Sequence, residues 1–96
     1  MPDTELKDAE FLDNSEAFLK GEIPRLTCDS VEKRDFILTS LGAKPQAANY
    51  IGEDLKTNET FYLRKTSNPE ISIEDRVPKD TKKPTNFYIY RKTDDN

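Results

Sequence analysis

Two segments, 60–66 and 86–92, mix aromatic and branched residues in the manner of β-strands, and they constrain the fold more than any other feature of the chain. Successive side chains of a strand point to opposite faces of its sheet. We therefore predict that one face of these two strands lies in the core and carries Phe61, Leu63, Phe87 and Ile89. The outer face is then predicted to carry Tyr62, Arg64, Tyr88, Tyr90 and Lys92.

The clearest predicted helix covers residues 30–41. Asp29 is expected to cap its start, Glu32 stands three residues later as in a capping box, and Gly42 is expected to end it. Apolar residues recur at helical spacing and extend the predicted core to Val31, Ile37, Leu38 and Leu41. Phe36 points about 200° away from Leu38 around the helix axis. Either this helix is covered on both sides, or Phe36 is a contact residue for a partner.

The N-terminal segment is acidic: residues 1–24 hold seven acidic side chains and two lysines, whereas residues 25–96 carry a net charge of +1. The pattern predicts either one helix over about 5–20 or a short helix over 14–20 that ends at Gly21. In the second case residues 1–12 are a flexible acidic segment.

The middle of the chain leaves two alternatives open. Residues 45–52 form either a two-turn helix or, within 48–55, a strand that pairs with 60–66 as a hairpin. A third strand is expected from 48–55 or from 23–28, because a two-stranded sheet is only marginally stable.

The segment 67–85 is punctuated by Pro69, Pro78 and Pro84, and we predict a long loop there, with a polar tail over 93–96. Together the segments predict a single α+β domain spanning residues 1–96. One or two N-terminal helices are expected to pack on a small, mostly antiparallel sheet of about three strands.

The composition argues against catalysis. The chain has no histidine and one cysteine, so it lacks a Ser/His or Cys/His pair and an internal disulfide framework. It also lacks the Cys/His set of a zinc site, a calcium-loop motif and a glycine-rich phosphate loop. We therefore expect no enzymatic activity, no metal and no cofactor, and we expect Cys28 to be a small buried residue at the end of a strand.

The apolar runs are too short to span a membrane, and the N-terminus does not resemble a signal peptide. We therefore expect no membrane association and a cytoplasmic location, or the host-cell cytoplasm if the gene belongs to a mobile element. The oligomeric state is left open.

The charge asymmetry and the tyrosines indicate candidate contact residues. Carboxylates spaced two or three apart in the N-terminal segment would attract a basic partner, and the tyrosine-rich outer face would supply the close contact. The candidate set from both features is Asp3, Glu5, Asp8, Glu10, Tyr62, Arg64, Tyr88, Tyr90 and Lys92. A secondary set is Phe36 with the loop lysines Lys79, Lys82 and Lys83.

These features favour a non-catalytic binding protein, an inhibitor or adaptor that acts by protein–protein contact on a larger macromolecule. That macromolecule could itself handle nucleic acid, because a row of carboxylates resembles a phosphate backbone. The alternative is a small nucleic-acid-binding domain. It would use the Tyr62/Tyr88/Tyr90 face to stack bases, or a winged-helix-like element built from 30–41 and a second helix over 45–51.

Overall fold

The computed structural model describes the backbone of residues 2–92 and the side chains of residues 9–92. Its elements in chain order are α1 (Pro2–Leu19), β1 (Arg25–Cys28), α2 (Val31–Ser40), β2 (Pro45–Asp54), β3 (Glu59–Thr66), β4 (Ile71–Pro78) and β5 (Asn86–Arg91). The predicted α+β class and the antiparallel sheet are confirmed. The sheet is larger than predicted, with five strands instead of about three.

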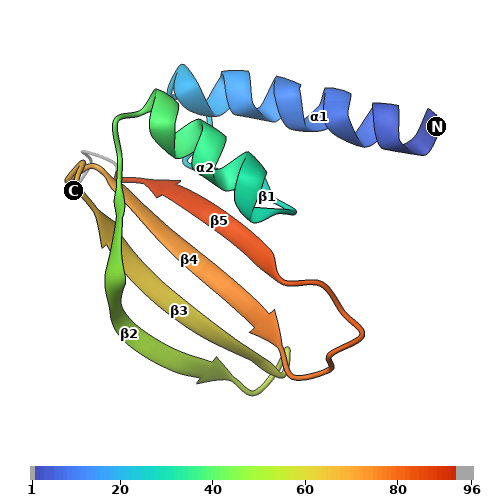
Figure 1. The fold of residues 1–96 in the computed structure, drawn as a ribbon, viewed down its shortest axis with the longest axis vertical. Helices are drawn as coiled ribbons and strands as arrows, with labels where there is room; N and C mark the ends of the chain where they lie inside the picture. Colours follow the sequence, from blue (N-terminus) through green and yellow to red (C-terminus); the bar gives the residue numbers. More distant parts are fainter. Residues whose placement is uncertain (1, 93–96) are drawn as a thin grey trace.

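The sheet has the order β1-β5-β4-β3-β2, and every neighbouring pair is antiparallel. Strands β2 to β5 follow one another as a meander, and β1 pairs with the last strand (Figure 1). Strand β4 lies at the centre of the sheet, so the prediction of a loop over 67–85 is wrong. The prolines do not interrupt β4, because Pro69 precedes the strand and Pro78 is its last residue.

Both segments that were candidates for a third strand belong to the sheet: 23–28 contains β1, and 48–55 overlaps β2. The segment 45–52 belongs to β2, so the helical alternative and the winged-helix arrangement that depended on it are wrong. The predicted β2–β3 hairpin is confirmed. Its turn is held by Asp54 Oδ1, which accepts hydrogen bonds from the amides of Lys56 and Thr57, and Asn58 adopts a φ of 60°.

The longer alternative for the first helix is confirmed, because α1 extends far upstream of residue 14. Gly21 ends it as predicted, with a φ of 82°, and the Glu22 amide donates to the Ala17 carbonyl at 2.8 Å. The cap of α2 is Ser30 and not Asp29: Ser30 Oγ accepts from the Lys33 amide at 3.2 Å. Asp29 instead forms an ion pair with Lys33 Nζ at 3.1 Å.

Both helices lie on one face of the sheet (Figure 1), and the hydrophobic core fills the space between the two layers. The buried hydrophobic residues are Phe18, Leu26, Cys28, Ile37, Leu38, Ala43, Ile71, Ile73 and Ile89. Of the other predicted core residues, Leu41 and Phe87 pack against this cluster. Val31 is 41% exposed, so its assignment to the core is wrong.

The structure also corrects the prediction of which side chains of β3 and β5 lie on the same face of the sheet. Tyr62 lies opposite Asp75, and Asp75 lies opposite Phe87, so Tyr62 shares the helix-covered face with Phe87. Phe61 and Leu63 therefore lie on the other face, and their assignment to the core is wrong. The alternation of each strand was predicted correctly, but the relation between them depends on β4, which lies between them.

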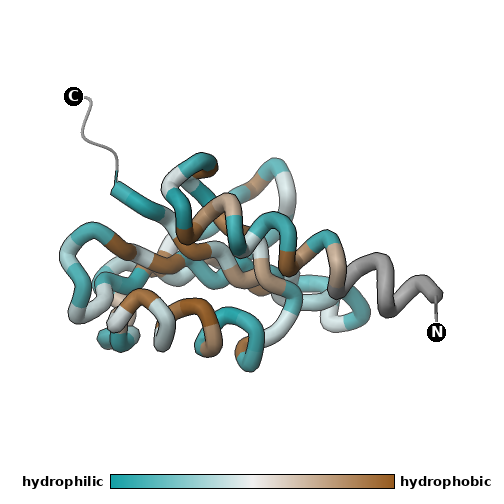
Figure 2. Tube along the Cα trace, turned by 90° about the horizontal axis from the view of Figure 1, so that it is seen from above, coloured by the Kyte–Doolittle hydropathy of each residue, from teal (hydrophilic) through white to brown (hydrophobic). Residues whose placement is uncertain are grey.

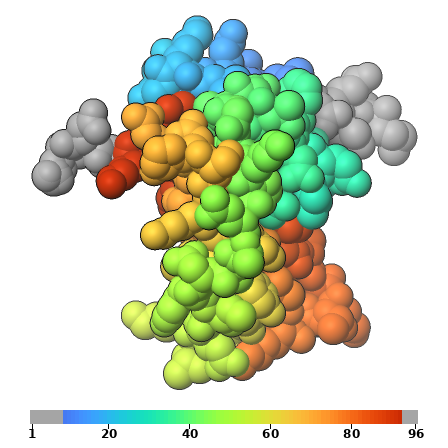
Figure 3. Space-filling model, turned by 60° about the vertical axis from the view of Figure 1, so that its left-hand side comes forward, coloured from blue at the N-terminus to red at the C-terminus, as the bar shows by residue number. Residues whose placement is uncertain are grey.

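We call the sheet face opposite the two helices the open face. The helices cover only one end of the sheet, and β2 and β3 extend beyond them (Figure 3). Hydrophobic and hydrophilic stretches are interspersed along the chain (Figure 2). No helix in the described part of the chain is both long enough and apolar enough to cross a membrane.

Candidate functional site

The open face is built from residues that the strand register brings into rows. One row crosses four strands with Arg25, Tyr90, Ser72 and Lys65. The next row contains Thr27, Tyr88, Glu74, Leu63 and Tyr50. A third row contains Asn86, Arg76, Phe61 and Gly52. Aromatic and charged side chains from all five strands therefore share one surface that neither α1 nor α2 covers.

The aromatic rings of the open face contact one another and two arginines. Tyr88 and Tyr90 have ring centroids 6.4 Å apart, and the Arg25 guanidinium lies 5.0 Å from the Tyr88 ring. Toward the other edge, the rings of Phe61 and Tyr50 have their centroids 6.0 Å apart. The Arg76 guanidinium lies 5.3 Å from the centroid of the Phe61 ring. Such ring and cation–π contacts hold the side chains in position before any partner arrives.

Gly52 makes room for this second aromatic pair. A Cβ atom on Gly52 would lie 2.6 Å from Cζ of Phe61 and 2.9 Å from Cε2 of Tyr50. Because β2 lacks a side chain at this point, both rings can lie over the strand backbone.

A polar network joins the two aromatic groups through Glu74 and Arg76. The Tyr90 hydroxyl donates to Glu74 Oε1 at 2.5 Å, and Arg76 Nε donates to Glu74 Oε2 at 3.0 Å. Arg76 Nη1 also donates to Asp54 Oδ2 at 3.0 Å and to Glu59 Oε1 at 3.2 Å. Three carboxylates therefore surround one guanidinium, which links β4 to β2 and β3.

The network shifts the pKa of several of its members. The hydrogen bond from Arg76 holds the pKa of Asp54 below its usual range. In turn, the hydrogen bond to Asp54 raises the pKa of Arg76. Burial, followed by the hydrogen bond to Glu74, raises the pKa of Tyr90, so its hydroxyl stays protonated. The network is therefore charged at Arg76 and neutral at Tyr90 near pH 7.

One end of the open face is positively charged. No carboxylate in the part of the chain that the structure describes forms an ion pair with Arg25, Lys65 or Lys92. A depression of about 500 Å³ lies at this end, and Lys65, Tyr90 and Lys92 are among its lining residues. A partner group that enters the depression would meet lysines and a tyrosine ring together, with the carboxylate of Glu70 also in its lining.

The structure separates the predicted tyrosine patch. Tyr88 and Tyr90 lie on the open face and Lys92 lies at its end, but Tyr62 and Arg64 lie on the opposite face. Arg64 is engaged there, with Nε 3.5 Å from Asp75 Oδ2. The prediction that all five residues share one surface is therefore wrong.

Other members of the open face were missed by sequence reasoning. They are Arg25, Tyr50, Phe61, Leu63, Glu74 and Arg76. Aromatic and charged residues of this kind are common at binding surfaces. No local sequence pattern, however, indicates on which face of the sheet a residue lies, because that depends on how its strand pairs.

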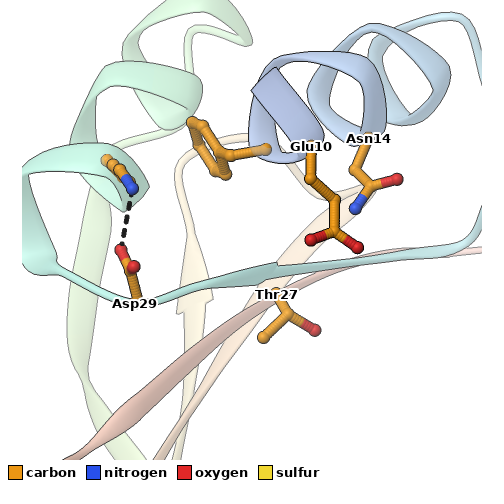
Figure 4. A pocket seen from close by; sticks show the side chains of 6 residues that line it. Glu10, Asn14, Thr27 and Asp29 are labelled. Atoms are coloured by element: carbon orange, nitrogen blue, oxygen red, sulfur yellow. Dashed lines mark ion pairs between the residues drawn. The ribbon is translucent and has the colours of Figure 1, made fainter. Parts of the chain in front are cut away.

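Of the four predicted acidic contact residues, Glu10 is the one whose side chain the structure describes, and it lies on α1. Helix α1 packs on the helix-covered side of the sheet, so Glu10 and the open-face tyrosines do not form one flat surface. Glu10 lines a depression at the β1 edge together with Asn14, Thr27 and Asp29 (Figure 4). The side chains of Asp3, Glu5 and Asp8 lie outside the described residues.

The secondary candidates are dispersed. Phe36 is 66% exposed on α2. Lys79 pairs with Glu53 at 3.4 Å, while Lys82 and Lys83 are exposed on the connection between β4 and β5. The structure therefore does not bring Phe36 and the lysines into one surface.

Cys28 is buried in the core, as predicted, and burial raises the pKa of its thiol to about 12. No group of three or more carboxylate or thiol side chains that could hold a metal ion occurs among the described residues.

The arrangement on the open face can bind a surface by aromatic, ionic and hydrogen-bond contact. Comparisons with protein-family models, curated proteins and solved structures found no match to this chain.

Proposed function

We propose that this protein is a non-catalytic binding protein that acts as an inhibitor or adaptor by contacting a protein partner through its open face. The observation that carries the proposal is the aromatic and ionic network that crosses the sheet without a helix covering it. Tyrosine and arginine, together with tryptophan, are enriched among the residues that contribute most to affinity at protein interfaces. Because internal contacts already order these side chains, binding would cost little side-chain entropy.

The charge of the open face favours a protein over a nucleic acid. Arg76, at the centre of the network, is neutralised by Asp54, Glu59 and Glu74. A phosphate backbone laid across the sheet would approach these carboxylates and be repelled by them. Within the described part of the chain, Arg25, Lys65 and Lys92 at one end of this face have no carboxylate partner, and this end suits an acidic or hydrogen-bonding group of a protein partner.

The alternative function is binding of single-stranded nucleic acid, which would use the two tyrosine rings and the cations at that same end. A titration of fluorescent single-stranded and duplex oligonucleotides at low and moderate salt separates the two functions. We expect no saturable binding at moderate salt. Tight binding that falls steeply with salt, and that Tyr88→Ser abolishes, would support the alternative and contradict the proposal.

The protein-binding proposal is tested with two matched tyrosine variants. Tyr88→Ser alters the open face, and Tyr62→Ser alters the opposite face with the same chemical change. The tagged wild type and both variants, each confirmed as folded by circular dichroism, are used to capture proteins from the source cell. Quantitative mass spectrometry then compares the captured proteins.

We expect Tyr88→Ser to lose a specific partner about 30-fold, which corresponds to the loss of about 2 kcal/mol from a central aromatic contact. Tyr62→Ser should retain that partner. If Tyr62→Ser loses the partner and Tyr88→Ser does not, the contact lies on the other side of the sheet.

A further inference from the structure

A groove of about 310 Å³ lies between α1 and α2, on the outer side of the helical layer. Leu12 and Leu19 of α1 form one wall, and Phe36 of α2 contributes to the other. Ser15 and Ile37, which are buried, close its floor. The groove therefore lies on the opposite side of the molecule from the open face.

The walls of the groove are apolar and exposed. Leu12 is 62% exposed, Leu19 is 41% exposed and Phe36 is 66% exposed, whereas the neighbouring Ile37 is buried. Exposed apolar side chains that gather around a concave surface are typical of an interaction site. Their burial in a complex would remove apolar surface from water, which favours association.

The rim of the groove is acidic. Asp13 and Glu16 line it from α1, and both are exposed. No cation in the described part of the chain forms an ion pair with either of them. Glu32, one turn before Phe36 on α2, is also exposed. A partner that fills the groove must therefore combine apolar side chains with positive charge.

We infer that the groove binds a basic amphipathic helix of a partner protein. Leu12 and Leu19 are two turns apart on one stripe of α1, a separation of about 10 Å. A partner helix lying along α1 would match this spacing with apolar residues at i, i+3 or i+4, and i+7. Its lysines or arginines would then face Asp13 and Glu16.

Two other occupants fit less well. A second copy of this chain would bring the exposed carboxylates of one α1 close to those of the other, which costs free energy. An anionic lipid surface would be repelled by the same carboxylates. The inference does not depend on the proposed function of the open face. If both hold, the chain binds two partners on opposite sides, as an adaptor does.

The probe is a synthetic peptide of about four helical turns with leucine at i, i+3, i+4 and i+7 and lysine at most other positions. The control peptide has the same composition in a scrambled order that lacks an apolar face. Each is titrated into the isotope-labelled full chain, and backbone amide shifts are followed by NMR. We expect saturable shifts at Leu12, Ser15, Leu19, Phe36 and Ile37 with the amphipathic peptide only.

Three variants of the chain identify the surface. Phe36→Ala should weaken binding of the peptide by about tenfold to 30-fold, because it removes one apolar wall of the groove. Glu16→Gln should reduce the dependence of affinity on salt. Tyr88→Ser, on the open face, should leave peptide binding unchanged, so failure of one proposal is distinguishable from failure of the other.

Three results would overturn the inference. The first is equal binding of the scrambled peptide, which would indicate general charge attraction. The second is unchanged affinity in Phe36→Ala. The third is self-association of the wild type in sedimentation experiments that Phe36→Ala abolishes, which would identify a second copy of the chain as the occupant.

Discussion

The guanidinium of Arg34 on α2 lies 2.9 Å from the carboxylate of Asp75 on β4, and both side chains are almost completely buried. The second oxygen of Asp75 lies 3.5 Å from Arg64 Nε on β3, and the Arg34 guanidinium also lies 5.2 Å from the Phe87 ring. One carboxylate thereby connects α2 with β3 and β4 in the interior.

We expect Asp75→Ala to lower the free energy of unfolding by about 3–5 kcal/mol, because buried Arg34 would keep only the longer ion pair with the exposed Asp35, at 3.4 Å. Replacing both residues, Arg34→Met with Asp75→Leu, should recover much of this loss, since no buried charge is left unpaired. Urea denaturation of the single and double variants measures both effects. A loss below about 1 kcal/mol for Asp75→Ala would show that the ion pair is solvated.

Leu38 and Val31 lie on the same helix and test the assignment of the core. Leu38 is 1% exposed and Val31 is 41% exposed. We expect Leu38→Ala to lower the free energy of unfolding by about 2–5 kcal/mol through loss of burial and a residual cavity. Val31→Ala should change it by less than about 0.5 kcal/mol. Thermal and urea denaturation give both values, and equal losses would contradict the described packing of α2.

Because of Asp54, the stability of the protein is expected to vary with pH in the acidic range. The hydrogen bond from Arg76 lowers the pKa of Asp54 in the folded state. Because the folded pKa lies below the unfolded one, the contribution of Asp54 is present above the ordinary carboxyl range and is lost as the pH falls through the folded pKa. We therefore expect the wild type to lose more stability on acidification than Asp54→Asn.

Urea denaturation from neutral pH down to about pH 2 measures this difference. The matched control is Glu22→Gln, at an exposed residue that forms no ion pair within the described part of the chain. The control should follow the wild type. Identical acid profiles of the wild type and Asp54→Asn would show that the Arg76 contact does not persist in solution.

Cys28 is expected to be unreactive in the folded protein. Burial raises the pKa of its thiol from 9.0 to about 12, which lowers the thiolate fraction near pH 8 by about a thousandfold. Labelling with a thiol reagent should therefore be slow under native conditions and fast in denaturant. Rapid labelling of the native protein would show that the core opens at the end of β1.

The raised pKa of Cys28 also predicts that the protein loses stability at alkaline pH. Since the folded pKa is the higher one, the contribution of Cys28 is complete below about pH 9 and is lost as the pH rises toward about 12. Cys28→Ala should reduce this loss without removing it, because the raised pKa of Tyr90 acts in the same direction. Urea denaturation between neutral and alkaline pH checks the effect. An unchanged alkaline profile would show that Cys28 does not titrate between the two states.

The local part of the fold could be predicted from sequence because its signals act over a few residues. Gly21 and Gly42 end the helices where a positive φ is needed, and both have one. The β5 segment was predicted because its alternation is strong, and the α+β class followed from combining such strands with helices. The same alternation predicted that Tyr88 and Tyr90 lie on the outer face of the sheet.

Strand β4 could not be predicted because its two buried carboxylates depend on partners from other elements as well as on Arg76 of the same strand. Glu74 and Asp75 are buried, and a run of charges between two prolines is typical of a solvated loop. Asp75 is buried because Arg34 and Arg64 neutralise it, and Glu74 because Arg76 and Tyr90 bond to it. A sequence pattern reports the polarity of a residue but not the presence of its partner.

The sequence by itself determined where the helices end, which segments alternate as strands, and that acidic charge gathers at the N-terminus. Only the tertiary structure decided that β4 separates β3 from β5, and this placed Phe61 beside Arg76 on the open face and Tyr62 opposite Asp75 on the other. The physical reason is the period of two along a strand: its alternation is local, but the face that it turns to the core depends on the strand with which it pairs.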